Sequence, residues 1–386
     1  MEGVDISSRL PRVLTESELE KLQREKPANE FKRKKLEVEA QKNWDKFYKR
    51  NKDKFFKDRH WSREDLVSLC AHINLKDHLT YLDAGCGVGN MLFPLIDYFP
   101  SWSFFGFDFS SNAIQLLHER AQSTQTSVSS CVADLCDSQH FPPPMLYSNG
   151  SPNMSIGVAS SSTYDRISLQ RPECPNAINH DAVPALEGSS SENSDGSCSA
   201  ALDYQTSNGL YCVDSECNDG VGNWPDNSIS FAATIPPNID PHKVRHVSQR
   251  NGSSALNGSK SIGFQGADLT TLIFVLSAIH PEKHAIAIRN LTKVVKKGGT
   301  VIVRDYGVND HAMIRFGRGA KLSDRFYARQ DGTRAFYFQL EELEQLFLAE
   351  GYSVKRSEYL FRKTVNHEKN LAVDRVFVQA VFVRIR

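Results

Sequence analysis

The residues best placed for chemistry form a glycine-rich turn, Gly85-Cys86-Gly87-Val88-Gly89, which follows the apolar run from Tyr81 to Ala84. Glycine lets the backbone pass close to a ligand. The N-terminus of a helix, expected here over Met91 to Tyr98, favours negative charge such as a carboxylate. A strand, a glycine turn and a helix in this order predict a site for a nucleotide-like ligand.

The third glycine separates two such ligands. Dinucleotide-binding proteins use Gly-x-Gly-x-x-Gly, but position 90 is Asn, and Gly-x-Gly-x-Gly favours S-adenosylmethionine (SAM) over NAD. Asp108 ends the next apolar run, where a carboxylate can accept hydrogen bonds from both ribose hydroxyls. An aspartate at a strand end could instead cap a helix, although Ser110 and Ser111 could also do so.

Three further residues are candidates to bind adenine. Asp134 is placed to accept from the amino group while Leu135 packs on the ring, and Ile273 could form an apolar wall, because ligands lie over the carboxyl ends of parallel strands. Each has a plainer alternative: Asp134 could be a turn residue, and the run around Ile273 could belong to the core.

The elements that must position these residues follow an alternation of strands and helices, which predicts a parallel sheet flanked by helices. The fold class is α/β: a seven-stranded, Rossmann-like, class I SAM-dependent methyltransferase sheet with an N-terminal helical extension. The predicted strands are about 79–83, 103–107, 128–132, 269–275, 299–304, 353–361 and 375–383. The methyltransferase domain comprises residues 61–142 and 267–386.

Residues 143–266 interrupt this domain with Ser, Asn, Gly, Pro and Asp and no sustained apolar period. Such a composition cannot bury enough surface to offset the entropy of ordering, so we predict a disordered insertion.

Residues 1–60 form the helical extension. Thr15 and Glu18 have the spacing of a capping box, which predicts a first helix over Thr15 to Lys26. A second is expected from Phe31 to Arg50, where Trp44 and Tyr48, four residues apart, share one face.

Formal charge is zero overall but uneven along the chain. Residues 21–60 hold 15 Lys/Arg against 7 Asp/Glu, which indicates a nucleic-acid partner, although a solvated helical face would also explain such a run. The eight cysteines show neither CxxC pairs nor zinc-site spacing, so we expect reduced thiols and no metal. No run is apolar enough to cross a bilayer. We expect a cytoplasmic protein that could also enter the nucleus.

Several long strings resemble the tRNA N3-methylcytidine methyltransferases, and among them the branch that acts on serine tRNAs. The resemblance covers about two thirds of the chain. Its strings are the glycine turn and residues 40–50, 55–61, 304–307, 310–313 and 329–334. Two departures stand out: the insertion, and Thr270-Thr271 where more apolar residues would be expected.

The resemblance implies that Trp44 and Tyr48 contribute to the SAM pocket beside Gly85, Asp108 and the three adenine candidates. It implies methylation of cytidine 32 in the anticodon loop of serine tRNAs, with seryl-tRNA synthetase as a possible partner. Cytosine N3 carries a lone pair at neutral pH, so no general base is needed, and the enzyme aligns the base and stabilises the charge that it gains.

Asp305 and Tyr306, with Arg304 beside them, are our candidates to hold the flipped base. Asp305 could instead pair with an arginine. The tRNA surface is predicted from basic residues interleaved with aromatic ones near an Asp331-Gly332 hairpin, although the core is the favoured place for each aromatic taken singly. Its basic members are Lys34, Lys35, Lys57, Arg59, Arg315, Arg325, Arg329 and Arg334.

Two other functions remain open from the residues alone. One is methylation of a protein or small molecule, which leaves the basic regions without a purpose. The other is an RNA-binding protein that has lost turnover because of the insertion.

Overall fold

The computed structural model describes residues 6–52, 63–146, 264–366 and 371–386. The fold below is that of these described residues, which all belong to one compact unit.

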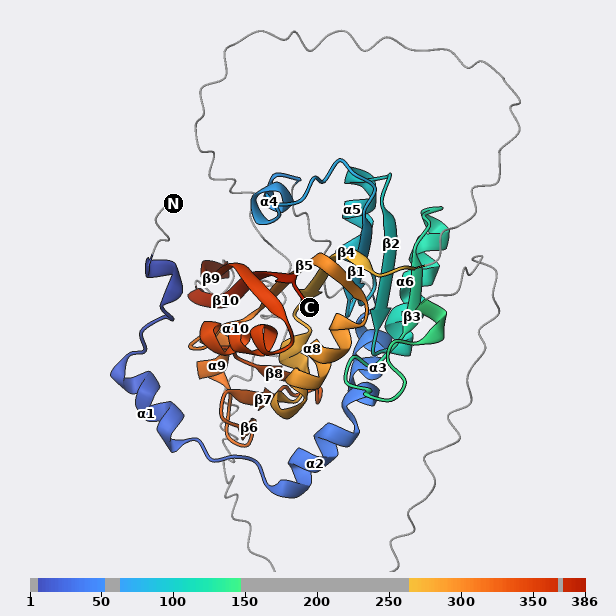
Figure 1. Ribbon diagram of the computed structural model, residues 1–386. Helices are drawn as coiled ribbons and strands as arrows, with labels where there is room; N and C mark the ends of the chain where they lie inside the picture. Colours follow the sequence, from blue (N-terminus) through green and yellow to red (C-terminus); the bar gives the residue numbers. More distant parts are fainter. Residues whose placement is uncertain (1–5, 53–62, 147–263, 367–370) are drawn as a thin grey trace, which may run out of the picture. The chain divides into compact units, whose positions relative to one another are not determined.

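All seven predicted strands are present in one sheet, in the order β3-β2-β1-β4-β5-β10-β9 (Figure 1). They are β1 Thr80–Ala84, β2 Ser103–Asp108, β3 Ser129–Val132, β4 Ala267–Ile273, β5 Val295–Tyr306, β9 Tyr352–Asn366 and β10 Leu371–Arg384. Strands β1 to β5 pair in parallel, whereas β10 pairs antiparallel with β5 and β9. The strand order reverses between β1 and β4. Their carboxyl ends therefore flank the crevice in which such sheets bind ligands.

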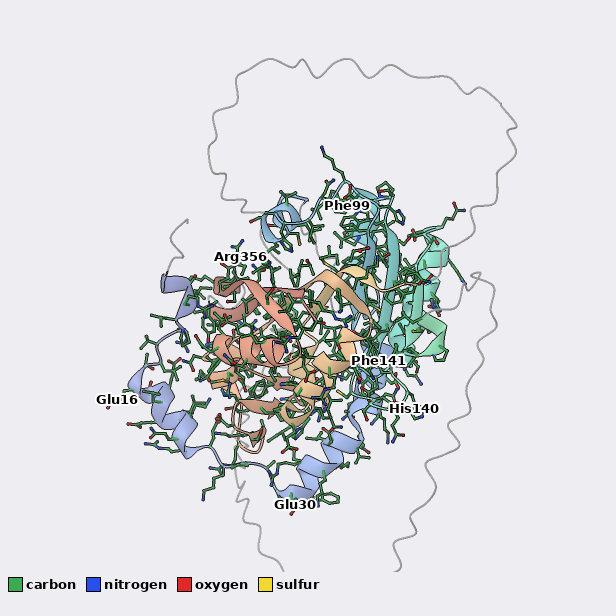
Figure 2. The ribbon with its side chains drawn as sticks, viewed as in Figure 1. Glu16, Glu30, Phe99, His140, Phe141 and Arg356 are labelled. Carbon is green, nitrogen blue, oxygen red and sulfur yellow. The ribbon has the colours of Figure 1, made fainter. Side chains whose placement is uncertain are left out.

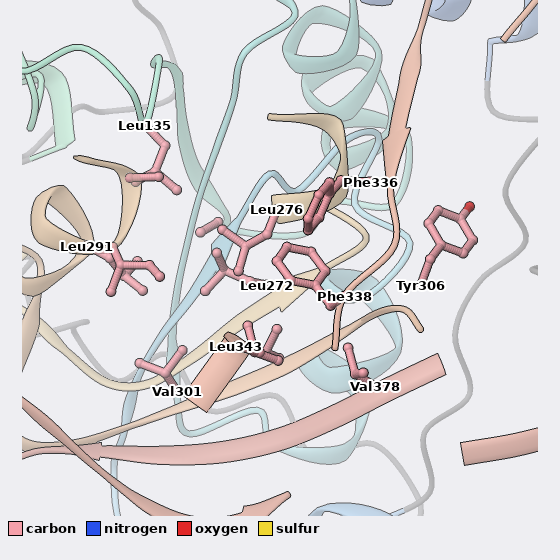
Figure 3. Close-up of a cluster of buried hydrophobic side chains, with 14 of the residues drawn as sticks. Leu135, Leu272, Leu276, Leu291, Val301, Tyr306, Phe336, Phe338, Leu343 and Val378 are labelled. Carbon is pink, nitrogen blue, oxygen red and sulfur yellow. The ribbon is translucent and has the colours of Figure 1, made fainter. Parts of the chain in front are cut away.

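Alternate residues of each strand pack against two layers of helices. Leu82 of β1 belongs to a core shared with α8 (His284–Thr292) and α10 (Leu340–Ala349), and Figure 3 shows part of this cluster. Tyr81, on the opposite face, packs in a second core with α4 (Arg63–Leu69), α5 (Leu92–Tyr98) and α6 (Ser111–Ser123). Burial on both faces explains why the central strands β1, β2 and β4 read as largely apolar runs.

A small second sheet contains the predicted hairpin. It consists of β6 Lys321–Ser323, β7 Phe326–Ala328 and β8 Arg334–Phe336, and it follows α9 His311–Arg315. Gly332 lies in the turn with φ of 86°, which glycine adopts readily. The aromatics of β7 and β8 are almost fully buried, so their alternative assignment to the core is confirmed.

The N-terminal helices are α1 Glu16–Arg24, α2 Glu30–Val38 and α3 Ala40–Asn51. The capping box of Thr15 and Glu18 is confirmed, but the predicted second helix is wrong as one unit, because the chain breaks at Glu39, with ψ of 10°. Figure 2 labels Glu16 and Glu30 at the starts of α1 and α2. We call residues 12–51 the N-terminal strap.

The strap is fastened to elements from the second half of the chain. Lys21 donates to the carbonyl of Ile314 in α9, and the amide of Ala28 donates to the carbonyl of Lys321 in β6 at 2.7 Å. Further on, Asn43 Nδ2 of α3 donates to the carbonyl of Gly332 at 3.1 Å. The strap thus runs from α9 along the small sheet to its hairpin.

The predicted insertion begins and ends inside the fold. Leu146, in a short 3-10 helix over Pro144–Leu146, is buried, and so is Phe264, whose ring meets Phe105 at 4.9 Å. The boundaries at 143 and 266 were therefore wrong by a few residues. Residues 147–263 lie outside the described part of the chain.

A buried ion pair gives a prediction for stability. Asp310 is fully buried and accepts from Arg375 Nε at 2.9 Å and from the amide of Val376 at 2.6 Å. Asp310→Ala removes the carboxylate that faces the buried guanidinium of Arg375, so we expect the free energy of unfolding to fall by about 3–5 kcal/mol in urea denaturation.

The matched control is Asp374→Ala, since Asp374 pairs with Lys363 at 4.0 Å with both side chains exposed. Here the loss should be about 0–1 kcal/mol. Equal losses for the two variants would contradict the assigned role of Asp310.

Candidate functional site

The glycine turn has a backbone that only glycine adopts easily. Gly85, Gly87 and Gly89 have φ of 77°, 54° and 86°. A methyl group added at Gly85 would lie 2.4 Å from a methyl carbon of Val275, in the loop after β4. The turn is thereby packed against the end of the neighbouring strand, at the crevice between β1 and β4.

Asp108 fastens this turn to the start of α6. Its Oδ2 accepts from the amide of Gly87 and its Oδ1 from the amide of Ser110, both at 2.8 Å. Ser110, not Asp108, is the N-cap of α6. Ser110 therefore takes the helix-capping role that was the alternative for Asp108. The carboxylate of Asp108 lies at the carboxyl ends of the strands, where we predict that the ribose binds. Burial raises the pKa of Asp108 to about 6, against the opposing effect of these amide donors.

Helix α3 is docked beside this carboxylate. Asp45 Oδ1 accepts from the hydroxyl of Ser110 at 2.6 Å, and its carbonyl accepts from Asn112 Nδ2 at 2.9 Å. Gln41 Nε2 donates to the carbonyl of Phe109 at 2.9 Å. The strap is thus joined by hydrogen bonds to the connection between β2 and α6.

The docking brings the predicted aromatic pair to the glycine turn. Trp44 and Tyr48 pack with Val88 in a small apolar cluster, and their ring centroids lie 6.0 Å apart. The hydroxyl of Tyr48 lies so close to Gly87 that an added methyl group would sit 2.7 Å from it. The structure therefore brings together Trp44, Tyr48, Gly85 and Asp108, four of the predicted cofactor residues, although their contact with SAM stays a prediction.

Ile273 ends β4 at the same crevice and is almost fully buried, in a core cluster that includes Cys86. The next residue, Phe274, has φ of 60°, a conformation that costs a non-glycine residue about 1–2 kcal/mol. Its amide donates to the carbonyl of Arg304 at 2.9 Å, and its ring faces Tyr306 at 4.9 Å. This bend ends β4 two residues before the predicted position and turns the chain across the sheet edge.

Asp134 and Leu135 lie after β3. Asp134 is exposed, and its Oδ1 accepts from the amide of Cys136 at 2.8 Å, which is the turn role considered as its alternative. Leu135 is buried in the core, and its carbonyl accepts from Asn290 Nδ2 at 2.8 Å. Their contact with adenine stays a prediction.

The three predicted catalytic residues do not share one surface. Arg304 donates to Gln379 of β10, whereas Asp305, the next residue in the strand, faces the other side. Asp305 is fully buried, and its carboxylate accepts from the amides of Ser277 and Tyr306, both at 2.9 Å. The prediction that Asp305 contacts the base directly is therefore wrong. Its carboxylate instead connects the ends of β4 and β5.

Burial raises the pKa of Asp305 to about 6. Tyr306 remains the candidate for base contact. Figure 3 shows its hydroxyl pointing away from the apolar cluster, and the guanidinium carbon of Arg329 lies 5.6 Å from its ring centroid. Tyr306 is only 8% exposed and its ring also packs against Phe274 and Tyr337, so its contact with a base stays a prediction.

The predicted RNA-binding residues separate into three groups. Lys34 and Lys35 are exposed on α2, and Arg315 and Arg329 are partly exposed. Arg334 is buried and bonded to Glu37 of the strap, and Arg325 pairs with Glu342 at 2.6 Å. Placing Arg334 in the RNA surface was wrong, because its charge is used inside the protein, and the same pairing speaks against Arg325. Lys57 and Arg59 lie outside the described residues.

Several residues that build this site were missed from the sequence. Asp45 joins α3 to α6, and Glu37 accepts from both Arg334 and Lys283. No local spacing signals either contact, because the partners are 65 or more residues away. Within the described ranges, no cluster of His, Cys, Asp or Glu could hold a metal ion, and no helix is long and apolar enough to span a membrane.

The raised pKa of Asp108 predicts a pH dependence for SAM binding. Ribose hydroxyls donate to the ionised carboxylate, and the free protein protonates it as pH falls through about 6. We expect the affinity for SAM, measured by calorimetry, to be constant above pH 7 and to weaken below pH 6, by up to about tenfold per pH unit.

Asp108→Asn should bind SAM weakly at every pH, so its affinity should not vary with pH. Asp305 also has a pKa of about 6 but is unchanged in this variant, so a flat profile assigns the pH dependence to Asp108. Unaltered affinity or an unaltered profile would refute the ribose assignment.

The chain matches known proteins over nearly its whole length. A methyltransferase domain family matches residues 41–356. The human tRNA N(3)-cytidine methyltransferase METTL6 is 32% identical over 97% of this chain and 90% of its own length. The fission yeast tRNA N(3)-methylcytidine methyltransferase trm141 is 24% identical over 91% of this chain and 95% of its own. Zebrafish METTL2, a tRNA N(3)-cytidine methyltransferase, is 42% identical over 31% of this chain and 33% of its own.

These matches confirm the family that the sequence strings indicated, and SAM is accordingly the methyl donor. The chain belongs to the tRNA N(3)-cytidine methyltransferase family.

Proposed function

We propose that this protein transfers the methyl group of SAM to N3 of cytidine 32 in the anticodon loop of serine tRNAs. Supporting this most directly is the match to curated tRNA N(3)-cytidine methyltransferases over 97% of the chain. The serine specificity, the position in the loop and help from seryl-tRNA synthetase rest on the resemblance of the sequence strings. We also propose a location in the cytoplasm with entry into the nucleus.

The strap supports this function because it links the donor site to the proposed base site. In the middle of α3, Asp45 is bonded to the connection after Asp108, and Asn43, two residues earlier, is bonded to Gly332. The hairpin that holds Gly332 also carries Arg329, which covers Tyr306. One helix thus fixes the distance between the methyl donor and the ring that would hold the base, which is the alignment that the reaction requires.

An exposed face of α2 supports an RNA partner. Phe31, Lys34, Lys35 and Val38 have the spacing of one helical face, and Phe31 and Val38 are 77% and 84% exposed. Lys34 also pairs with Glu30, at 2.7 Å on the surface. An exposed phenylalanine beside lysines is the combination with which proteins stack on unpaired bases and contact phosphates.

The decisive experiment is tRNA sequencing after expression of the chain in cells that lack their own N3-methylcytidine enzymes. We expect the modification to return at position 32 of serine tRNAs, and the Asp108→Ala variant to leave it absent. Return on other tRNAs alone would contradict the serine assignment. Incubation with labelled SAM, total tRNA and protein extract tests the wider claim: label found only in protein would overturn an RNA substrate.

The α2 face gives a second prediction. Lys34→Gln with Lys35→Gln should weaken tRNA binding several-fold and lower the slope of log affinity against log salt by about 1–2, because two phosphate contacts are lost. The affinity for SAM should stay the same. Lys76→Gln is the control, since Lys76 is exposed in the loop before β1. This loop lies at the amino end of β1, whereas the glycine turn lies at its carboxyl end. Equal effects of the control and the double variant would remove α2 from the RNA surface.

A further inference from the structure

Three polar side chains meet inside the sheet directly below the glycine turn. Tyr81 and Asp83 lie on the same face of β1, and Thr271 is the register partner of Asp83 on β4. The hydroxyls of Tyr81 and Thr271 are 2.6 Å apart, and Thr271 Oγ1 donates to Asp83 Oδ1 at 2.7 Å. All three residues are buried, so these bonds form away from water.

The direction of this chain follows from the groups themselves. An ionised carboxylate can only accept hydrogen bonds, and a threonine hydroxyl has a single hydrogen. Thr271 gives that hydrogen to Asp83, so its oxygen must accept the hydrogen of Tyr81. The result is one directed chain, from Tyr81 through Thr271 to Asp83, in which each bond strengthens the next.

Asp83 lies where this chain can act on the cofactor. It is two residues before Gly85, at the carboxyl end of β1 beside the strand reversal. Asp83 and Asp108 are both close enough to the buried thiol of Cys86 to raise its pKa, in addition to the effect of burial. Two carboxylates therefore flank the glycine turn. SAM carries two positive charges, a sulfonium and an ammonium, which such carboxylates complement.

We propose that Thr271 is a positioning residue for SAM, which holds the carboxylate of Asp83 in the orientation that complements the positive charge of the cofactor. The neighbouring Thr270 supplies the contrast. It is equally buried, yet among the described residues its Oγ1 has no hydrogen-bond partner. These two adjacent threonines lie in a run where apolar residues would be expected. The hydroxyl of Thr271 donates to Asp83, whereas that of Thr270 has no such role.

The test compares the two threonines by calorimetry with SAM and without RNA. Thr271→Val keeps the shape but removes the donor to Asp83, and we expect the Kd for SAM to rise about tenfold, the effect of one hydrogen bond to a charged group. Thr271→Ser should restore the affinity to within about twofold. Thr270→Val, the matched control, should also stay within about twofold, because it removes a hydroxyl without a partner.

Steady-state kinetics distinguish positioning from general destabilisation. The KM for SAM should rise in Thr271→Val while the KM for tRNA stays constant. Tyr81→Phe should raise the Kd about threefold, and adding it to Thr271→Val should cause no further loss, since the chain is already broken. If Thr271→Val does not fold, Tyr81→Phe and Thr271→Ser still decide the matter: affinity unchanged in Tyr81→Phe and lost in Thr271→Ser would overturn the proposal.

Equal losses in Thr270→Val and Thr271→Val would also overturn it. The inference rests on the donor site of the proposed function. Because SAM binding is measured without RNA, a failure here is distinct from a failure to methylate tRNA.

Discussion

The two hydrogen bonds that the carboxylate of Asp108 accepts hold the donor site together. One fixes Gly87 in the turn after β1, and the other fixes Ser110 at the start of α6. Because the hydroxyl of Ser110 donates to Asp45, the strap is connected to the same point. Burying a carboxylate disfavours its ionised form, and the raised pKa indicates that two amide donors do not fully offset this. The site is thus prepared for additional donors, which the ribose hydroxyls of SAM can supply.

Much of the fold could be predicted because its signals are local. The central strands β1, β2 and β4 are largely apolar runs buried on both faces, Thr15 and Glu18 form a cap within one turn, and the hairpin has an Asp-Gly pair at its tip. The break at Glu39 and the bend at Phe274 have no such signal. In both cases tertiary contacts determine the backbone, and at Phe274 they hold a phenylalanine in a conformation for which the sequence would normally use glycine.

The residues of the site likewise include some that local signals predict and others that depend on distant contacts. The glycine turn and Asp108 could be found because the spacing of a strand, a turn and an acid is fixed by the fold. The sequence could not separate the RNA-binding arginines from the structural ones. A charge pattern along the chain does not distinguish a guanidinium that faces solvent from one that is paired inside the protein. The partner of Arg334 is Glu37, 297 residues earlier in the chain. Asp305 was misjudged for a related reason: the end of a strand can face the ligand or the core.

The attachment points of the strap have a consequence for how the protein is made. Helices α1 to α3 leave the ribosome first, but Ile314, Lys321, Gly332 and Arg334, to which they are fastened, are synthesised some 300 residues later. Domains tend to fold from the N-terminus as they emerge. Here α1 and α2 must wait for partners at residues 314–334, whereas Gln41 and Asp45 of α3 already meet theirs by residue 112. The strap therefore docks in two stages, with the aromatic cover of the glycine turn attached before the helices that precede it.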